Sequence, residues 1–196
     1  MTAEPLTFYY DFNSPYSWLA AERINQVLPV VPEWQPISYS HVIRHTGVPP
    51  WSVKEGREVR MREIERRAAE RGLPRISWIE GWPLQTISLP ALRTAIFAQQ
   101  AGRAVAYSLA AFRQMFAGGK NLAEVDNVLI AAAACELHPR AVLKGIEMQS
   151  VKEALTRATN EAIERGVTGV PTVAIGDRLF WGDDRLEDAA AALAAA

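Results

Sequence analysis

Hydrophobic residues follow different patterns near the ends of this chain and through its middle. Near the N-terminus, the aromatic run Leu6–Phe12 predicts a strand. Ser14, followed by a proline, is a typical helix start and predicts a helix over Tyr16–Leu28. A second strand is predicted over Glu33–Ser40. Strand, helix and strand joined by a crossover of this length form a parallel β–α–β unit.

The C-terminal pattern is a hairpin followed by a helix. Val170–Ile175 is rich in strand-forming residues, Gly176 and Asp177 form a turn, and Arg178–Trp181 returns as a second strand. A helix over Arg185–Leu193 follows, with acidic residues near its start, where the helix dipole favours them.

The long middle of the chain has helical spacing throughout, with no internal repeat and no low-complexity linker. Helices are predicted over Val53–Arg71, Leu89–Ala101, Val105–Phe116, Glu124–Leu137, Pro139–Glu147 and Val151–Arg165. The sequence therefore predicts an α/β, thioredoxin-like fold (βαβ…ββα) that carries a large all-helical insertion. Residues 1–45 and 166–196 would form one discontinuous thioredoxin-like domain, and residues 46–165 the helical insertion domain.

Composition narrows the class of partner. The 196 residues contain 21 Lys and Arg against 22 Asp and Glu, a net charge of -1, which argues against a nucleic-acid or anionic-membrane binder. No stretch approaches the roughly 20 apolar residues of a membrane span. Met1–Asp11 lacks the basic and apolar regions of a secretion signal, so we expect a cytoplasmic protein. The single cysteine, Cys135, excludes an intrachain disulfide and a CxxC pair, and we expect it to be a small core residue of a buried helix.

The segment Ser14-Pro15-Tyr16-Ser17 has the form of a redox Cys-Pro-X-Cys box in which both sulfurs are replaced by hydroxyls. Unpaired N–H groups and the helix dipole favour negative charge at this point. A serine there cannot cycle through a disulfide, but it can donate a hydrogen bond to an external thiolate. The plainer interpretation is that Ser14 only caps the helix.

Two further segments near the C-terminus are candidates for binding. Val170-Pro171 opens a strand, and a cis bond here would present the N–H and C=O of Val170 as an open edge for an extended peptide. The alternative is an ordinary trans proline at the start of an edge strand. Asp183 and Asp184 either cap the last helix or pair with the amino group of a bound peptide.

The order of these motifs resembles a known group. The segments Tyr9–Leu19, Ser88–Arg93 and Gly166–Arg185 are similar to the DsbA-like branch of the thioredoxin superfamily, in particular to kappa-class glutathione transferases and 2-hydroxychromene-2-carboxylate isomerases. The resemblance covers nearly the whole chain. It implies a homodimeric enzyme that uses glutathione as its cofactor.

The resemblance also implies roles for individual residues. The serine that matches Ser14 hydrogen-bonds the glutathione sulfur and is the main catalytic residue of that family. The residue that matches Val170, before a cis-proline that matches Pro171, pairs through its backbone with the cysteinyl part of glutathione. The positions that match Asp183 and Asp184 hold the γ-glutamyl end.

We therefore expect a glutathione-dependent isomerase or transferase that acts on an electrophilic aromatic or conjugated acid, and not a dithiol–disulfide oxidoreductase. Two alternatives stay open. One is a non-catalytic module that binds peptides at the Val170-Pro171 edge. The other is an enzyme of this fold with another thiol cofactor, because Val48 stands where the family commonly carries an asparagine.

Histidines and tryptophans of the middle segment offer weaker signals. His41 and His45 are four residues apart and would share a helix face, but no third ligand accompanies them, so we expect no metal site. Either histidine is better suited to carrying protons in a substrate pocket. Trp51, Trp78 and Trp82 lie between the predicted helices, where they either pack or receive a planar aromatic substrate.

Overall fold

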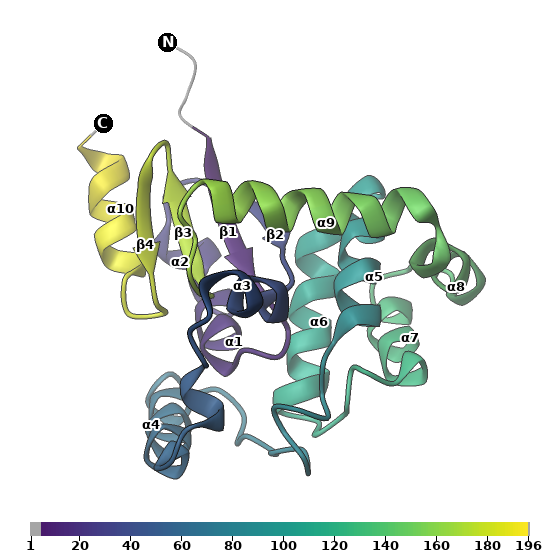
Figure 1. Ribbon diagram of the computed structural model, residues 1–196, viewed down its shortest axis with the longest axis horizontal. Helices are drawn as coiled ribbons and strands as arrows, with labels where there is room; N and C mark the ends of the chain where they lie inside the picture. Colours follow the sequence, from purple (N-terminus) through teal and green to yellow (C-terminus); the bar gives the residue numbers. More distant parts are fainter. Residues whose placement is uncertain (1–4, 196) are drawn as a thin grey trace.

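The computed structural model describes residues 5–195 and contains a four-stranded sheet of order β2-β1-β3-β4 (Figure 1). Strand β1 (Leu6–Tyr10) is central, pairing in parallel with β2 (Glu33–Pro36) and antiparallel with β3 (Thr172–Ile175). Strand β4 (Arg178–Trp181) completes the predicted hairpin. The two ends of the sequence therefore build one sheet, which confirms the βαβ…ββα expectation.

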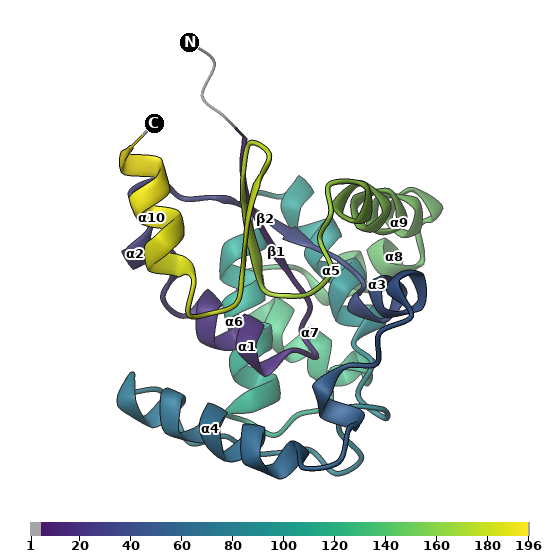
Figure 2. The same ribbon diagram turned by 60° about the vertical axis from the view of Figure 1, so that its left-hand side comes forward.

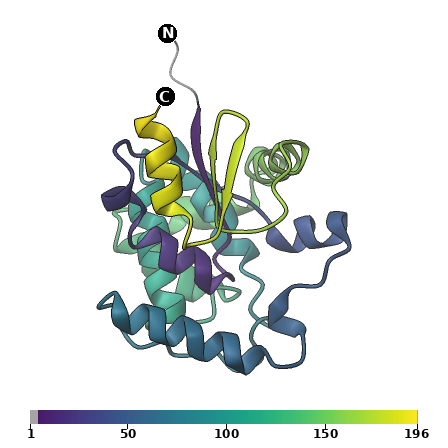
Figure 3. The ribbon, with the colours of Figure 1, turned by 90° about the vertical axis from the view of Figure 1, so that its left-hand side faces the viewer.

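Helices surround this sheet, and every regular element between β2 and β3 is helical. They are α1 (Pro15–Ala21), α2 (Ile24–Val27), α3 (Tyr39–Thr46), α4 (Arg57–Glu70), α5 (Leu89–Gln100), α6 (Ala104–Phe116), α7 (Val125–Ala133), α8 (Pro139–Glu147), α9 (Gln149–Glu164) and α10 (Leu186–Ala194), with a short 3-10 turn at Trp51–Val53. Helix α10 packs on β3 and β4, whereas α5 and α9 contact β2. Helix α4 lies next to α1 at one end of the molecule, away from the β3–β4 turn (Figures 2 and 3). The division into two domains stays a prediction.

The core explains why β1 is aromatic along its length. Strand β1 is covered on both faces, and Phe8 and Tyr10 stack with ring centroids 5.3 Å apart. Phe12, just beyond the strand, lies 4.9 Å from the ring of Phe112 on α6. Each such side chain contributes about 1.5–3 kcal/mol through burial alone. The helical middle of the chain is thus fastened directly to the central strand that leads into α1.

The single helix predicted over Tyr16–Leu28 is wrong, because the chain breaks into α1 and α2. The N–H of Arg23 bonds to the carbonyl of Ala20 in a tight turn. Glu22 at the break accepts two hydrogen bonds from Arg113 of α6, at 2.8 and 2.7 Å. A contact between segments distant in sequence therefore accompanies the interruption.

The second strand is shorter than predicted, since β2 ends at Pro36 and the chain turns into α3 from Tyr39. The N–H of Ser38 donates to Thr159 Oγ1 at 3.0 Å, and the N–H of Tyr39 donates to Asp11 Oδ2 at 2.8 Å. These acceptors replace a strand partner at the start of the helix.

Within residues 5–195, no helix combines the length and the hydrophobicity that crossing a membrane requires.

Candidate active site

The start of α1 is shaped by the backbone and side chain of Ser14. Ser14 is the N-cap, with extended backbone (φ -98°, ψ 113°), and its Oγ accepts a hydrogen bond from the N–H of Ser17 at 3.2 Å. Pro15 occupies the first turn, where its missing N–H costs nothing. The hydroxyl of Ser17 is fully buried and has no hydrogen-bond partner among the described residues. Ser14 is therefore the hydroxyl that faces the site.

The second predicted segment lies directly against the first. The Val170-Pro171 bond is cis, as the family resemblance implies, so the alternative of an ordinary trans proline is wrong. The Ser14 hydroxyl donates to the Val170 carbonyl at 3.4 Å, a long contact that joins positions 156 residues apart. Among the hydrogen bonds within residues 5–195, none uses the N–H of Val170. The Ser14 hydroxyl, the free N–H of Val170 and the N-terminus of α1 thus lie close together.

The two aspartates before α10 occupy different environments. Asp183 is 1% exposed and forms ion pairs with Arg67 at 2.8 Å and Arg71 at 2.7 Å, both from α4. Burial lowers the pKa of Arg67, but Asp183 and Glu63 outweigh it, so the pKa is raised overall and the guanidinium stays charged. Asp184 is exposed. Asp183 therefore fastens α4 to the hairpin, whereas the carboxylate of Asp184 is accessible to a ligand.

A buried carboxylate that the sequence did not reveal lies just before Ser14. Asp11 is 5% exposed and accepts hydrogen bonds from the N–H groups of Asn13 (2.9 Å) and Tyr39 (2.8 Å) and from the hydroxyl of Ser88 (3.2 Å). Burial raises its pKa, and these three donors act in the opposite direction. Asp11 thereby joins the starts of α1, α3 and α5 around the site.

Asn13 anchors a second wall of the site, the loop that precedes α5. Its side chain donates to the carbonyl of Pro83 at 2.9 Å and accepts from the hydroxyl of Thr86 at 2.7 Å, while its own carbonyl accepts from Trp82 Nε1 at 3.2 Å. Both Asn13 and Asp11 lie within the Tyr9–Leu19 segment that carries the family resemblance, but the sequence assigned a role to neither. Their position immediately before Ser14 was the only available signal.

The tryptophans left open by the sequence gather beside Tyr16, two residues after Ser14. Ring centroids lie 5.7 Å apart for Tyr16 and Trp51, 5.6 Å for Trp51 and Trp82, and 4.9 Å for Trp82 and Trp78. We call these four residues the aromatic cluster. Arginines of α4 border it, since Arg57 donates to the carbonyl of Trp82 at 3.3 Å and Arg67 lies 5.8 Å from the centre of the Tyr16 ring.

His41 and His45 both lie on α3, as the spacing predicted. Within residues 5–195 no three His, Cys, Asp or Glu side chains form a group that could hold a metal ion. Cys135 is buried, as expected, but it lies in the turn after α7 and not within a helix, because α7 ends at Ala133. Burial raises the pKa of its thiol, while Arg103 acts in the opposite direction. A buried thiol with a raised pKa is a poor nucleophile.

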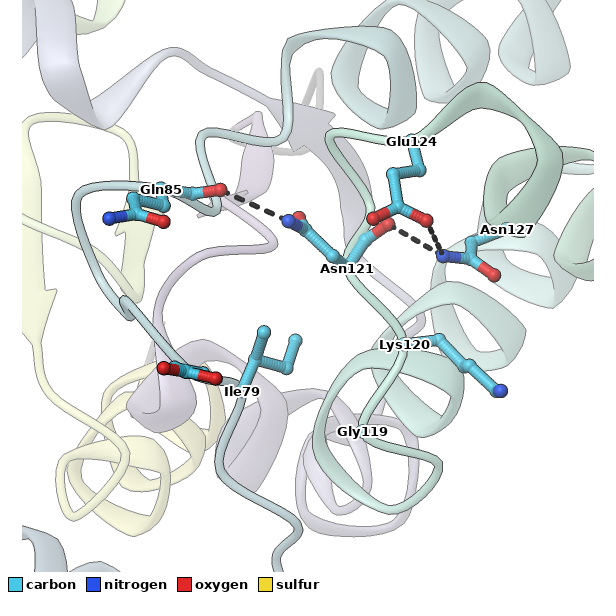
Figure 4. Close-up of a pocket in the computed structure, with 8 residues that line it drawn as sticks. Ile79, Gln85, Gly119, Lys120, Asn121, Glu124 and Asn127 are labelled. Atoms are coloured by element: carbon cyan, nitrogen blue, oxygen red, sulfur yellow. Dashed lines mark hydrogen bonds between the residues drawn. The ribbon is translucent and has the colours of Figure 1, made fainter.

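A polar hollow of about 440 Å³ lies elsewhere, between the loop that follows Trp78 and the start of α7 (Figure 4). It is lined by Ile79, Glu80, Gln85, Gly119, Lys120, Asn121, Glu124 and Asn127. Asn121 bridges its two walls by donating to the carbonyl of Gln85 at 3.0 Å. None of the residues predicted from the sequence to bind or react lines it.

Comparisons with known proteins agree with the DsbA-like thioredoxin fold. The sequence model of a family described as a DSBA-like thioredoxin domain matches residues 5–194. A 2-hydroxychromene-2-carboxylate isomerase of Sphingobium xenophagum is 25% identical over 188 residues, covering 93% of this chain and 94% of that protein. One of Pseudomonas putida is 26% identical over 195 residues, covering 91% and 89%. The solved structure of a 2-hydroxychromene-2-carboxylate isomerase has a TM-score of 0.85 at 22% identity, covering 97% and 94% of the two chains.

Proposed function

The chain belongs to the family of DSBA-like thioredoxin domains, and we propose that within it the protein is a glutathione-dependent isomerase. Its relatives at about a quarter sequence identity are named as 2-hydroxychromene-2-carboxylate isomerases, and such names support an enzyme with a small-molecule substrate. One observation carries the proposal. A serine stands at the start of α1, against the cis Val170-Pro171 edge, where dithiol enzymes of this fold keep a cysteine.

The residues around Ser14 fit a thiol tripeptide. The unpaired N–H of Val170 and its carbonyl offer the two hydrogen bonds that an extended peptide makes when it adds to a strand. Exposed Asp184 offers a carboxylate to an ammonium group. Glutathione, when bound, supplies a thiolate that adds reversibly to a conjugated double bond, so that the bond can rotate before elimination.

Ser14 is the proposed catalytic residue. The one hydrogen bond that its hydroxyl donates is a long contact of 3.4 Å to the Val170 carbonyl, so donating to a sulfur instead gives up little free energy. A hydrogen bond from this hydroxyl and the positive end of α1 both favour the anionic form of a thiol. Because Pro15 and the network of Asp11 hold the helix start in place, the donor is oriented before the reaction begins.

The aromatic cluster and its arginines are the proposed acceptor side. Tyr16, Trp51 and Trp78 are partly exposed, and Tyr16 lies in the first turn of α1 with Trp51 packed against it. Arg57, with 41% of its side chain exposed, lies beside them. Ring faces suit a planar substrate and a guanidinium suits its carboxylate, so this side supports an aromatic or conjugated acid. A transferase would use the same two sides and release the adduct as its product.

Turnover of 2-hydroxychromene-2-carboxylate with glutathione tests the proposal through Ser14→Ala. We expect a loss of about 10²–10³ in kcat, the usual effect of removing one donor to a developing anion. Ser17→Ala is the matched control, because it removes a buried hydroxyl that has no partner. Undiminished turnover in Ser14→Ala would reject Ser14 as the thiolate partner.

The open N–H of Val170 also suits a second candidate, a module that binds extended peptides without catalysis. Calorimetry separates the two. Heat with millimolar glutathione supports the enzyme, whereas binding of extended peptides and none of glutathione would favour the module. Binding of a different low-molecular-weight thiol would point to another thiol cofactor.

By its resemblance to dimeric enzymes we also propose a homodimer, which sedimentation would show.

A further inference from the structure

Asn13, at the turn into α1, is bonded to the loop of residues 79–87 through both its side chain and its backbone. Its amide nitrogen donates to the carbonyl of Pro83 at 2.9 Å, and its amide oxygen accepts from the Thr86 hydroxyl at 2.7 Å. Its own carbonyl accepts from Trp82 Nε1 at 3.2 Å. One residue therefore joins the start of α1 to the loop that carries part of the aromatic cluster.

Loop 79–87 has few other hydrogen bonds to the rest of the described chain. Arg57 donates to the carbonyl of Trp82 at 3.3 Å, and Asn121 donates to the carbonyl of Gln85 at 3.0 Å across the polar hollow (Figure 4). The contacts with Asn13 are better shielded from water, because Thr86 is fully buried and Trp82 is 5% exposed. The position of the loop relative to α1 therefore depends mainly on Asn13.

We infer that Asn13 is a positioning residue that sets the gap between the thiolate at Ser14 and the acceptor held by the aromatic cluster, an inference that rests on the proposed function. Trp82 is central to that cluster, since its ring contacts both Trp51 and Trp78. A shift of Trp82 would therefore shift a planar acceptor with it. Bond formation needs the two reacting atoms at contact distance and in line, and a misplacement of about 1 Å costs about 100-fold in rate.

Losing the amide would separate loop 79–87 from α1 and leave each of them formed. The N–H of Asn13, which donates to Asp11 Oδ1 at 2.9 Å, does not depend on the side chain. Ser14 stays the N-cap of α1. The Thr86 hydroxyl already lies 3.2 Å from the Pro83 carbonyl, so it keeps an acceptor within the loop. The thiolate side should thus keep its properties while the acceptor side moves.

Kinetics with glutathione and 2-hydroxychromene-2-carboxylate test this inference on the full chain. Asn13→Ala should lower kcat by about 10–100-fold and leave the dissociation constant of glutathione and the pKa of its bound thiol unchanged. Thr86→Val removes the hydroxyl that bonds the amide and should cause a smaller loss, whereas Thr86→Ser keeps that hydroxyl and should retain activity. Asn25→Ala is the control, because this amide also accepts from an indole, that of Trp34 at 3.4 Å, but lies on α2.

The outcomes separate the inference from the proposed function. Unchanged kcat in Asn13→Ala would overturn the inference alone. A weaker affinity for glutathione or a raised pKa of its thiol in that variant would also overturn it, because the amide would then act on the thiolate side or on the fold. Equal losses in Thr86→Ser and Thr86→Val would do the same, since the hydroxyl would not be the group that matters. No glutathione binding or no turnover by the unaltered protein would overturn the proposed function, and the inference with it.

Discussion

Arg67 of α4 and Asp183 before α10 form a 2.8 Å ion pair that joins segments 116 residues apart. Arg71 binds the other oxygen of the same carboxylate at 2.7 Å. The pair connects α4, which borders the aromatic cluster, to the hairpin that presents the Val170 edge. Asp183 therefore holds together the two sides of the proposed site.

Asp183→Ala should lower the free energy of unfolding by about 2–4 kcal/mol, because it leaves two arginines without their shared partner. The cost stays below that of a fully buried pair, since the arginine side chains are 21% and 19% exposed. Asp184→Ala, at an exposed position, should change it by less than about 0.5 kcal/mol. Urea unfolding measures both, and equal effects would refute the structural role of Asp183.

Asp11 should make stability fall as pH rises. Burial raises its pKa in the folded protein above the ordinary 3.8, so the folded state binds more protons than the unfolded state above that pH. Stability contributed by the protonated form is then lost as pH climbs toward the folded-state pKa.

Asp11→Asn removes this titration. Urea unfolding of both proteins from pH 3.5 or so upward should show the unaltered protein losing free energy of unfolding relative to the variant. The amide also lowers the free energy of unfolding by an amount that does not depend on pH, because it fails to accept from Tyr39. The test is therefore how the difference in free energy of unfolding between the two proteins changes with pH, and not its absolute size. Parallel curves would contradict the account of Asp11.

Trp51→Leu should raise KM for the aromatic acid several-fold and leave the dissociation constant of glutathione unchanged. Trp51 contacts Tyr16 and Trp82 within the aromatic cluster, and its loss removes a ring face worth about 1 kcal/mol to a planar ligand. Steady-state kinetics and calorimetry provide the two readouts. A change confined to glutathione affinity would place the acceptor elsewhere.

Much of the fold was predictable because its signals are local. The hairpin of β3 and β4 and the helices α5 and α8 follow from turn residues, prolines and apolar spacing, and the structure confirms them. The break after Ala21 was not predictable. It coincides with the bonds between Glu22 and Arg113, 91 residues away, which no local pattern records.

The candidate site likewise combines features that have a local sequence signal with features that depend on contacts between distant segments. Ser14 and the cis bond before Pro171 carry their own sequence signals, but only the structure brings them within one hydrogen bond. Partners of Asp11 and Asp183 come from other elements, so burial and ion pairing at these positions could not be read from the sequence. The close approach of the Trp181 indole to Gly169 was equally hidden, because these residues belong to different segments.

The pKa of the glutathione thiol bound to this protein tests the central claim most directly. Ultraviolet absorbance of the thiolate, followed across pH, measures it in the unaltered protein and in Ser14→Ala. We expect a bound thiol with a pKa at least one unit below the roughly 8.5 of an unperturbed cysteine, and a rise toward that value when the hydroxyl is removed. The same pKa in both proteins would contradict the role of Ser14.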